Sequence, residues 1–187
     1  MTPEAVLRQV IGALERAGIE YMLTGSFASS YHGVPRATQD IDLVIDGNED
    51  QILGFARELS AAGFYVSEVA ATEAVSLRGP FNVIDQSTGW KVDLILRRDR
   101  PFSRNEFSRR TLEEAFGFPL FVATAEDTLL AKLEWSGLVD SEQQLRDAVG
   151  IVRSQGERLD RAYIRRWARE LGLMDQWERV SERAGLG

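Results

Sequence analysis

Two aspartates separated by a single residue lie within an apolar run of the sequence, Asp40-Ile-Asp42-Leu-Val-Ile. This alternation predicts a strand over residues 41–45, and side chains two residues apart on a strand point to the same face. Two neighbouring carboxylates on a partly buried sheet are unfavourable without a positive charge between them. A divalent cation supplies that charge, and Mg²⁺ prefers a few carboxylates together with phosphate oxygens. The pair therefore predicts a magnesium site that also receives a phosphate-bearing ligand.

Two further motifs flank this pair. Gly25-Ser26 follows a predicted strand over 19–24 and begins a short predicted helix that ends near Tyr31. Glycine allows close backbone approach, and the N–H groups of a helix start can bind phosphate. A third acid, Asp93, lies in a predicted strand over 90–96, where Lys91 shares its face. Asp93 therefore either completes the acidic site or forms a Lys–Asp pair on an exposed strand.

Taken together, Gly25-Ser26, Asp40-Ile-Asp42 and Val92-Asp93-Leu94 resemble the nucleotidyltransferase superfamily with the polymerase-β-like catalytic core. The chain looks most like its small stand-alone members, the toxin-type (AbiEii-like) and antibiotic-modifying nucleotidyltransferases. The resemblance implies that Asp40, Asp42 and Asp93 are catalytic and hold two Mg²⁺ ions, and that Asp93 helps to deprotonate an acceptor hydroxyl. It also implies that Gly25 and Ser26 bind the phosphates of a nucleoside triphosphate.

The same resemblance extends to residues outside the three motifs. Arg36 and Thr38 precede the acids in a pattern that similar enzymes carry, which implies a role in ordering the triphosphate; the alternative for Arg36 is an ion pair with a surface acid. Lys132, on a predicted helix, and Arg146-Asp147, on the next, match residues that contact nucleotide phosphates and brace the site in relatives. The alternative for Lys132 is a side chain that extends along the helix to reach solvent.

The pattern of apolar residues predicts an α+β fold. A mixed β-sheet with helices on one face is expected to form a catalytic core over 1–120, followed by a helical C-terminal extension over 121–187 packed on the core. Within the core, strands are expected over 64–68, 74–77, 81–85 and 90–96. Beyond residue 126 the apolar spacing is helical.

Composition narrows the functional classes. The chain has no cysteine, which excludes disulfides and thiolate metal sites. No apolar run reaches the length of a membrane span and no signal peptide is visible, so a cytoplasmic protein is expected. The net charge of −7 disfavours non-specific DNA binding. A cluster of six arginines could face phosphates or form an ordinary solvated surface: Arg97, Arg98, Arg100, Arg104, Arg109 and Arg110.

The sequence thus predicts a Mg²⁺-dependent nucleotidyltransferase that transfers a nucleoside monophosphate, AMP by analogy, from an NTP to an acceptor hydroxyl and releases pyrophosphate. The alternative is a non-catalytic nucleotide-binding or regulatory module, for example a toxin–antitoxin component. The acceptor stays open among a small molecule, an RNA end and a protein side chain. A homodimer is compatible with the resemblance, and no membrane partner is expected.

Overall fold

The computed structural model describes residues 2–38, 40–139 and 141–186, and the chain divides into two compact units. The first unit comprises residues 1–24 and 38–122, and the second comprises residues 25–37 and 123–187. Each unit contains its own set of the residues that the sequence analysis singled out.

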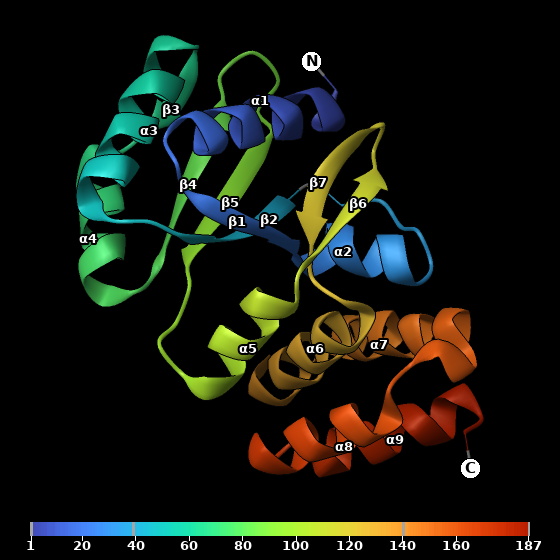
Figure 1. The fold of residues 1–187 in the computed structure, drawn as a ribbon. Coiled ribbons are helices and arrows are strands. Elements are labelled where there is room, and N and C mark those ends of the chain that lie inside the picture. Colours follow the sequence, from blue (N-terminus) through green and yellow to red (C-terminus); the bar gives the residue numbers. More distant parts are fainter. Residues whose placement is uncertain (1, 39, 140, 187) are drawn as a thin grey trace. The chain divides into compact units, whose positions relative to one another are not determined.

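The first unit is built on a mixed seven-stranded sheet in the order β3-β4-β5-β2-β1-β7-β6 (Figure 1). Strand β2 pairs antiparallel with β1 and parallel with β5, so β2 and β5 lie near the middle of the sheet. The strands are β1 (Glu20–Thr24), β2 (Asp40–Asp46), β3 (Phe64–Val66), β4 (Pro80–Asp85), β5 (Lys91–Leu96), β6 (Thr111–Ala115) and β7 (Phe118–Val122).

Strict alternation in the two central strands separates an apolar face from a polar one. Ile41, Leu43 and Ile45 of β2 are fully buried, as are Val92 and Leu94 of β5. Helix α3 (Glu49–Ala61) packs against both α1 (Pro3–Arg16) and α4 (Glu68–Leu77). Helices α1 and α3 contribute large buried side chains to the core, and α4 contributes Ala71 and Ala74. The expected α+β fold with a mixed sheet is confirmed.

One predicted strand is wrong. Residues 74–77 belong to α4, and the strand predicted over 64–68 ends at Val66 as β3. The Ser67 hydroxyl accepts a hydrogen bond from the Ala70 N–H, which caps the start of α4. Alanines at positions 70, 71 and 74 then favour a helix over the strand predicted for residues 74–77. Arg78, with φ of 49°, ends the helix in the left-handed conformation.

Residues 97–120, for which the sequence predicts no helix or strand, form one helix and two strands. Helix α5 (Pro101–Arg109) follows β5, and the β6–β7 hairpin completes one edge of the sheet. Strand β7 pairs parallel with β1 through Leu23 and Val122.

The second unit is helical. It joins α2 (Gly25–His32) to α6 (Ala125–Val139), α7 (Glu142–Gln155), a single turn η1 (Gly156–Arg158), α8 (Arg161–Glu170) and α9 (Met174–Ala184). Buried side chains such as Leu130, Ile151 and Trp177 form its core. Helix α2 packs against α6 and α7, although almost a hundred residues separate them in the sequence.

The boundary between the two units at Val122–Ala123 lies close to the predicted boundary after residue 120. The structural division additionally groups residues 25–37 with the C-terminal helices. The functional division into a catalytic core over 1–120 and an extension over 121–187 stays a prediction.

Candidate functional site

The first unit brings the three predicted catalytic acids onto two adjacent strands. Asp42 of β2 lies directly opposite Asp93 of β5 in the parallel pairing, and Asp40 lies opposite Lys91. Neighbouring residues in register point to the same face of a sheet. Asp40, Asp42, Asp93 and Lys91 therefore share the polar face of the central strands.

The lysine provides the positive charge for this cluster. The Lys91 ammonium lies 2.8 Å from Oδ2 of Asp93 and 3.3 Å from Oδ1 of Asp40. Its hydrogen bond to Asp93 raises the pKa of Lys91 above its ordinary value, against the opposing effect of burial. The ammonium thus pairs with two of the three carboxylates, and the four side chains together have a net negative charge.

The oxygen-rich donor set fits a hard cation such as Mg²⁺. The arrangement of the side chains, however, is organised around Lys91. Within the described part of the chain, no group of three or more acidic, histidine or cysteine side chains is placed to hold a metal ion. A metal ion at this position would have to take over the carboxylates that Lys91 now binds, so metal ligation by Asp40, Asp42 and Asp93 stays a prediction.

Two polar residues extend the row of acids and were not singled out from the sequence. Thr24 of β1 lies opposite Asp42, and Asn82 of β4 lies opposite Asp93. The row Thr24–Asp42–Asp93–Asn82 therefore runs across four neighbouring strands. Asn82 belongs to no recognised motif, so its place in the row follows only from the pairing of β4 with β5.

The second unit contains the predicted phosphate-binding residues at the start of α2. Gly25 has φ of +64°, a conformation that favours glycine. The adjacent Ser26 hydroxyl accepts a hydrogen bond of 2.5 Å from Nη2 of Arg36. Arg36 is thus held beside the first turn of α2 within the second unit.

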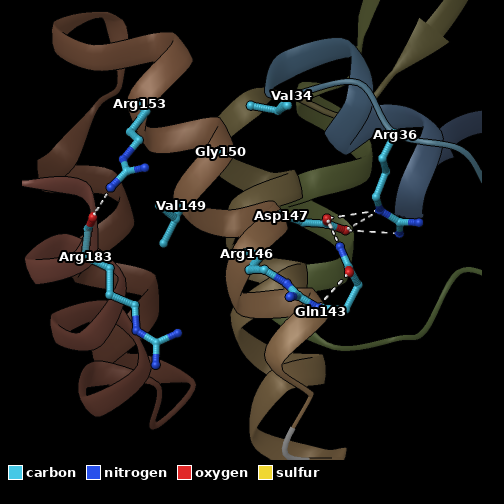
Figure 2. A pocket seen from close by; sticks show the side chains of 9 residues that line it. All are labelled: Val34, Arg36, Gln143, Arg146, Asp147, Val149, Gly150, Arg153 and Arg183. Atoms are coloured by element: carbon cyan, nitrogen blue, oxygen red, sulfur yellow. Dashed lines mark hydrogen bonds and ion pairs between the residues drawn. The ribbon is translucent and has the colours of Figure 1, made fainter.

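Asp147 lies at the centre of a network in the same unit. Its carboxylate accepts hydrogen bonds from Nε of Arg36 at 3.1 Å, Nζ of Lys132 at 2.9 Å and Nε2 of Gln143 at 2.8 Å. The side chains of Lys132 and Asp147 are only 5% and 6% exposed. Figure 2 shows Arg36 and Gln143 converging on Asp147.

This network shows the partners of two residues whose roles the sequence left open. Arg36 pairs with a buried acid rather than a surface one, and Lys132 is paired inside the unit rather than extended toward solvent. Burial raises the pKa of Asp147, but hydrogen bonds from Arg36 and Lys132 outweigh it and lower that pKa below its ordinary value. Removing one partner of such a buried pair typically costs about 3–5 kcal/mol, because an uncompensated charge is left behind.

Two of the predicted nucleotide-binding residues lie outside this network. Arg146 is exposed and donates a hydrogen bond of 3.1 Å to Oε1 of Gln143. Thr38 belongs to the first unit, where its hydroxyl donates a hydrogen bond of 3.4 Å to the Asp40 carbonyl. Gln143 was not singled out from the sequence. It lies four residues before Asp147 on the same helix, a spacing that brings two side chains together and could have indicated this contact. Nucleotide binding by Gly25, Ser26, Arg36, Thr38, Lys132, Arg146 and Asp147 stays a prediction.

Much of the arginine cluster over 97–110 is bound to acids of the first unit. Arg97 contacts Asp46 at 2.7 Å and Arg110 contacts Glu20 at 2.6 Å, and both arginine side chains are largely buried. Arg104 pairs with Asp99 at 2.5 Å. These ion pairs favour a structural role for the three arginines over the binding of phosphates.

No family model matches the sequence, and no curated protein is significantly similar to it. The fold nevertheless matches solved nucleotidyltransferases. The solution structure of the antibiotic-resistance factor ANT(2'')-Ia superposes with a TM-score of 0.61 at 13% identity over 94% of this chain and 96% of that one. The crystal structure of ANT(2'')-Ia with adenylyl-2''-tobramycin gives 0.58 at 14% identity, over 98% and 99% of the two chains.

A third match is an antigenic nucleotidyltransferase-like protein from Paracoccidioides brasiliensis. Its TM-score is 0.56 at 19% identity, over 80% of this chain and 74% of that one. At these identities the likeness concerns the fold, and the chain has the fold of nucleotidyltransferases. The resemblance inferred from the motifs is confirmed at that level. Among the described residues, no helix has the length and apolar character needed to cross a membrane.

Proposed function

We propose that this protein is a divalent-metal-dependent nucleotidyltransferase that moves a nucleoside monophosphate from an NTP to an acceptor hydroxyl. The observation that carries the proposal is the register of β2 and β5, which places Asp42 beside Asp93 and next to Asp40 on one face of a nucleotidyltransferase fold. We take ATP as the donor by analogy with the adenylylated tobramycin bound to ANT(2'')-Ia.

The proposed reaction is an in-line displacement. The acceptor oxygen forms a bond to the α-phosphorus, and the bond from that phosphorus to the bridging β-phosphate oxygen breaks, so that pyrophosphate leaves. The Asp93 carboxylate accepts the proton of the acceptor hydroxyl. A bound divalent cation supplies charge neutralisation for the phosphates and the leaving group. Catalysis then depends mainly on positioning and electrostatics.

The proposal assigns phosphate binding to the second unit. In the Asp147 network two cations, Arg36 and Lys132, pair with one carboxylate, so the network has a net positive charge. Asp147 holds these two side chains in fixed positions, and the N–H groups at the start of α2 add donors for phosphate oxygens. A rigid set of donors lowers the entropic cost of ordering a flexible triphosphate.

Release of pyrophosphate tests this function directly. The purified protein is incubated with Mg²⁺, each of the four NTPs and a panel of hydroxyl acceptors, with an Asp42→Asn/Asp93→Asn variant in parallel. The proposal predicts acceptor-dependent pyrophosphate release by the wild type alone. Equal release by both proteins would contradict it.

One observation favours the alternative of a non-catalytic nucleotide-binding module. Lys91 already compensates part of the acidic cluster, so the fold does not require a metal ion there. If NTP binds equally well with Mg²⁺ and with EDTA and no acceptor supports pyrophosphate release, this alternative replaces the proposed enzyme.

A further inference from the structure

The row Thr24–Asp42–Asp93–Asn82 on the polar face of the sheet has two different ends. Thr24 is followed in the chain by Gly25, where the proposed function places the phosphates of the donor. Asn82 of β4 forms the other end, next to Asp93, which accepts the proton of the acceptor in the proposed reaction. In that reaction, an acceptor that does not overlap the donor approaches Asp93 from the side of β4 and β3.

An aromatic and an aliphatic side chain lie on this part of the sheet face. Ile84 of β4 lies opposite Lys91, one row away from Asp93. Tyr65 of β3 lies opposite Ile84. Opposite residues share a face of the sheet, so Tyr65 and Ile84 lie on the same face as Asp93. Tyr65 is 55% exposed and Ile84 is partly exposed, so a ligand can contact both.

A second pair of apolar side chains borders the acids on their other side. Val44 of β2 lies opposite Ile95 of β5, and each follows an acid of its own strand by two residues. Both side chains are partly exposed. The acids therefore lie between two rows that each contain partly exposed apolar groups. Small-molecule sites generally combine such an apolar surface with a few polar groups.

The end of the row at β4 is uncharged. Among the described residues of β3 and β4, the only carboxylate is Asp85, which lies on the opposite face, is 4% exposed and accepts hydrogen bonds from Ser87 and Thr88. Asn82 contributes an exposed amide, and within the ranges that the structure describes this amide makes no hydrogen bond. An acceptor at this end therefore meets an amide and apolar groups rather than carboxylates.

The spacing of the strands limits the shape of such an acceptor. Asn82 and Asp93 lie opposite each other in antiparallel strands, where Cβ atoms are about 4.5–5.5 Å apart, so one hydroxyl group can contact both. Tyr65 is two strands from β5, or roughly 10 Å. A molecule that reaches both places needs its ring and its reacting hydroxyl on separate parts, as in an aryl glycoside.

We propose that Tyr65, Ile84 and Asn82 form the acceptor subsite, and that the acceptor is an uncharged molecule with an aromatic ring and a separate hydroxyl group. This inference rests on the proposed function for the position of the reacting atoms. The ring packs on Tyr65 and Ile84, and the Asn82 amide donates a hydrogen bond to the hydroxyl oxygen. Asp93 takes the hydroxyl proton as this oxygen bonds to the α-phosphorus and pyrophosphate leaves.

Binding of 4-nitrophenyl β-glucoside without nucleotide, followed in ¹H–¹⁵N spectra, tests the subsite apart from turnover. The glucoside should shift the amides of Tyr65, Asn82 and Ile84, whereas glucose, which lacks the aromatic ring, and tobramycin should not. Tyr65→Ala should weaken binding about tenfold, equivalent to about 1.4 kcal/mol, and Tyr65→Phe should restore it. Leu112→Ala removes an exposed apolar side chain from the opposite edge strand and is the matched control. Absence of these shifts, or full affinity in Tyr65→Ala, would overturn the inference.

Transfer from ATP with Mg²⁺ separates the inference from the proposed function. With the glucoside as acceptor, Asn82→Ala should raise the KM for the glucoside several-fold and leave the KM for ATP unchanged. Transfer to tobramycin or to the 3′ hydroxyl of an RNA oligomer, but not to the glucoside, would overturn the inference and keep the proposed enzyme. Binding of the glucoside at these residues without transfer to any acceptor would support the binding surface and contradict the proposed function.

Discussion

The two units combine charges in opposite ways. In the first, one ammonium, that of Lys91, pairs with two of the three carboxylates on the polar face of the central strands. In the second, one buried carboxylate, that of Asp147, holds two cations and an amide. The first arrangement has an excess of negative charge, and the second has an excess of positive charge. In the proposed function the first accepts a divalent cation and the second binds the phosphates of the nucleotide.

The largest expected effect concerns the acids of the first unit. Asp40→Asn/Asp42→Asn should reduce the rate of nucleotidyl transfer at least roughly 10²–10³-fold. This is the loss typical of enzymes from which one group that stabilises the transition state is removed. The fold should persist, because both side chains lie on the polar face and no core group is removed. Pyrophosphate release and circular dichroism measure the two effects. Asp99→Asn, at an exposed acid, is the control; transfer at wild-type rate in the double variant would remove the acids from the mechanism.

Substitutions in the Asp147 network of the second unit should change the free energy of unfolding. Asp147→Ala leaves the buried Lys132 ammonium without a partner and should lower the free energy of unfolding by about 3–5 kcal/mol. Urea denaturation measures this change. Lys132→Met/Asp147→Leu removes both charges and should recover much of the loss, because a buried ion pair can often be replaced by apolar groups. A loss below about 1 kcal/mol in the single variant, as for a surface pair, would show that the network is not buried in solution.

The fall of the free energy of unfolding at acid pH should depend on the same network. Because the pKa of Asp147 is lower in the folded protein, the unfolded chain binds this proton more readily, and stability rises with pH. The contribution is complete above the ordinary carboxyl pKa of about 4 and is lost as pH falls toward the lowered value. Urea denaturation between about pH 6 and pH 3 should therefore show a steeper loss for the wild type than for Asp147→Asn. Equal slopes would assign the acid sensitivity to other carboxylates.

The smallest effect concerns Lys91. Lys91→Met removes the internal counter-ion and should strengthen Mn²⁺ or Mg²⁺ binding a few-fold, equivalent to about 1 kcal/mol for a partly exposed pair. Lys91→Arg keeps the charge and should bind metal as the wild type does. Calorimetry with each metal ion provides the measurement. Weaker metal binding in the Met variant would show that Lys91 supports the metal site rather than competing with it.

The sequence predicted the central part of the fold because alternation and turn residues are local signals. The strands that contain Asp42 and Asp93 were identified from their own neighbours, and their pairing then followed from the fold. The missed elements depend on longer-range or weaker signals. Helix α4 begins at the Ser67 cap, and the β6–β7 hairpin contains Pro119 and two glutamates, which obscure a strand pattern. Asn82 joins the polar row only through its pairing with Asp93.

The sequence indicated several residues of the site but not the contacts between them. Motif resemblance singled out Arg36, Lys132 and Asp147, but spacing alone does not show that one carboxylate binds both cations. The role of Asp93 was open between completing the acidic site and pairing with Lys91, and the structure shows Lys91 bound to both Asp93 and Asp40. The residues that line the pocket in Figure 2 come from three distant segments, which no local pattern links.

The most direct test of the proposed function is calorimetric binding of each NTP, with Mg²⁺ and with EDTA, to the wild type and to Asp40→Asn/Asp42→Asn. We predict that at least one NTP binds the wild type in a Mg²⁺-dependent manner and that this dependence is lost in the variant. Binding of no NTP, or binding that is the same with EDTA and in the variant, would contradict a metal-dependent nucleotidyltransferase.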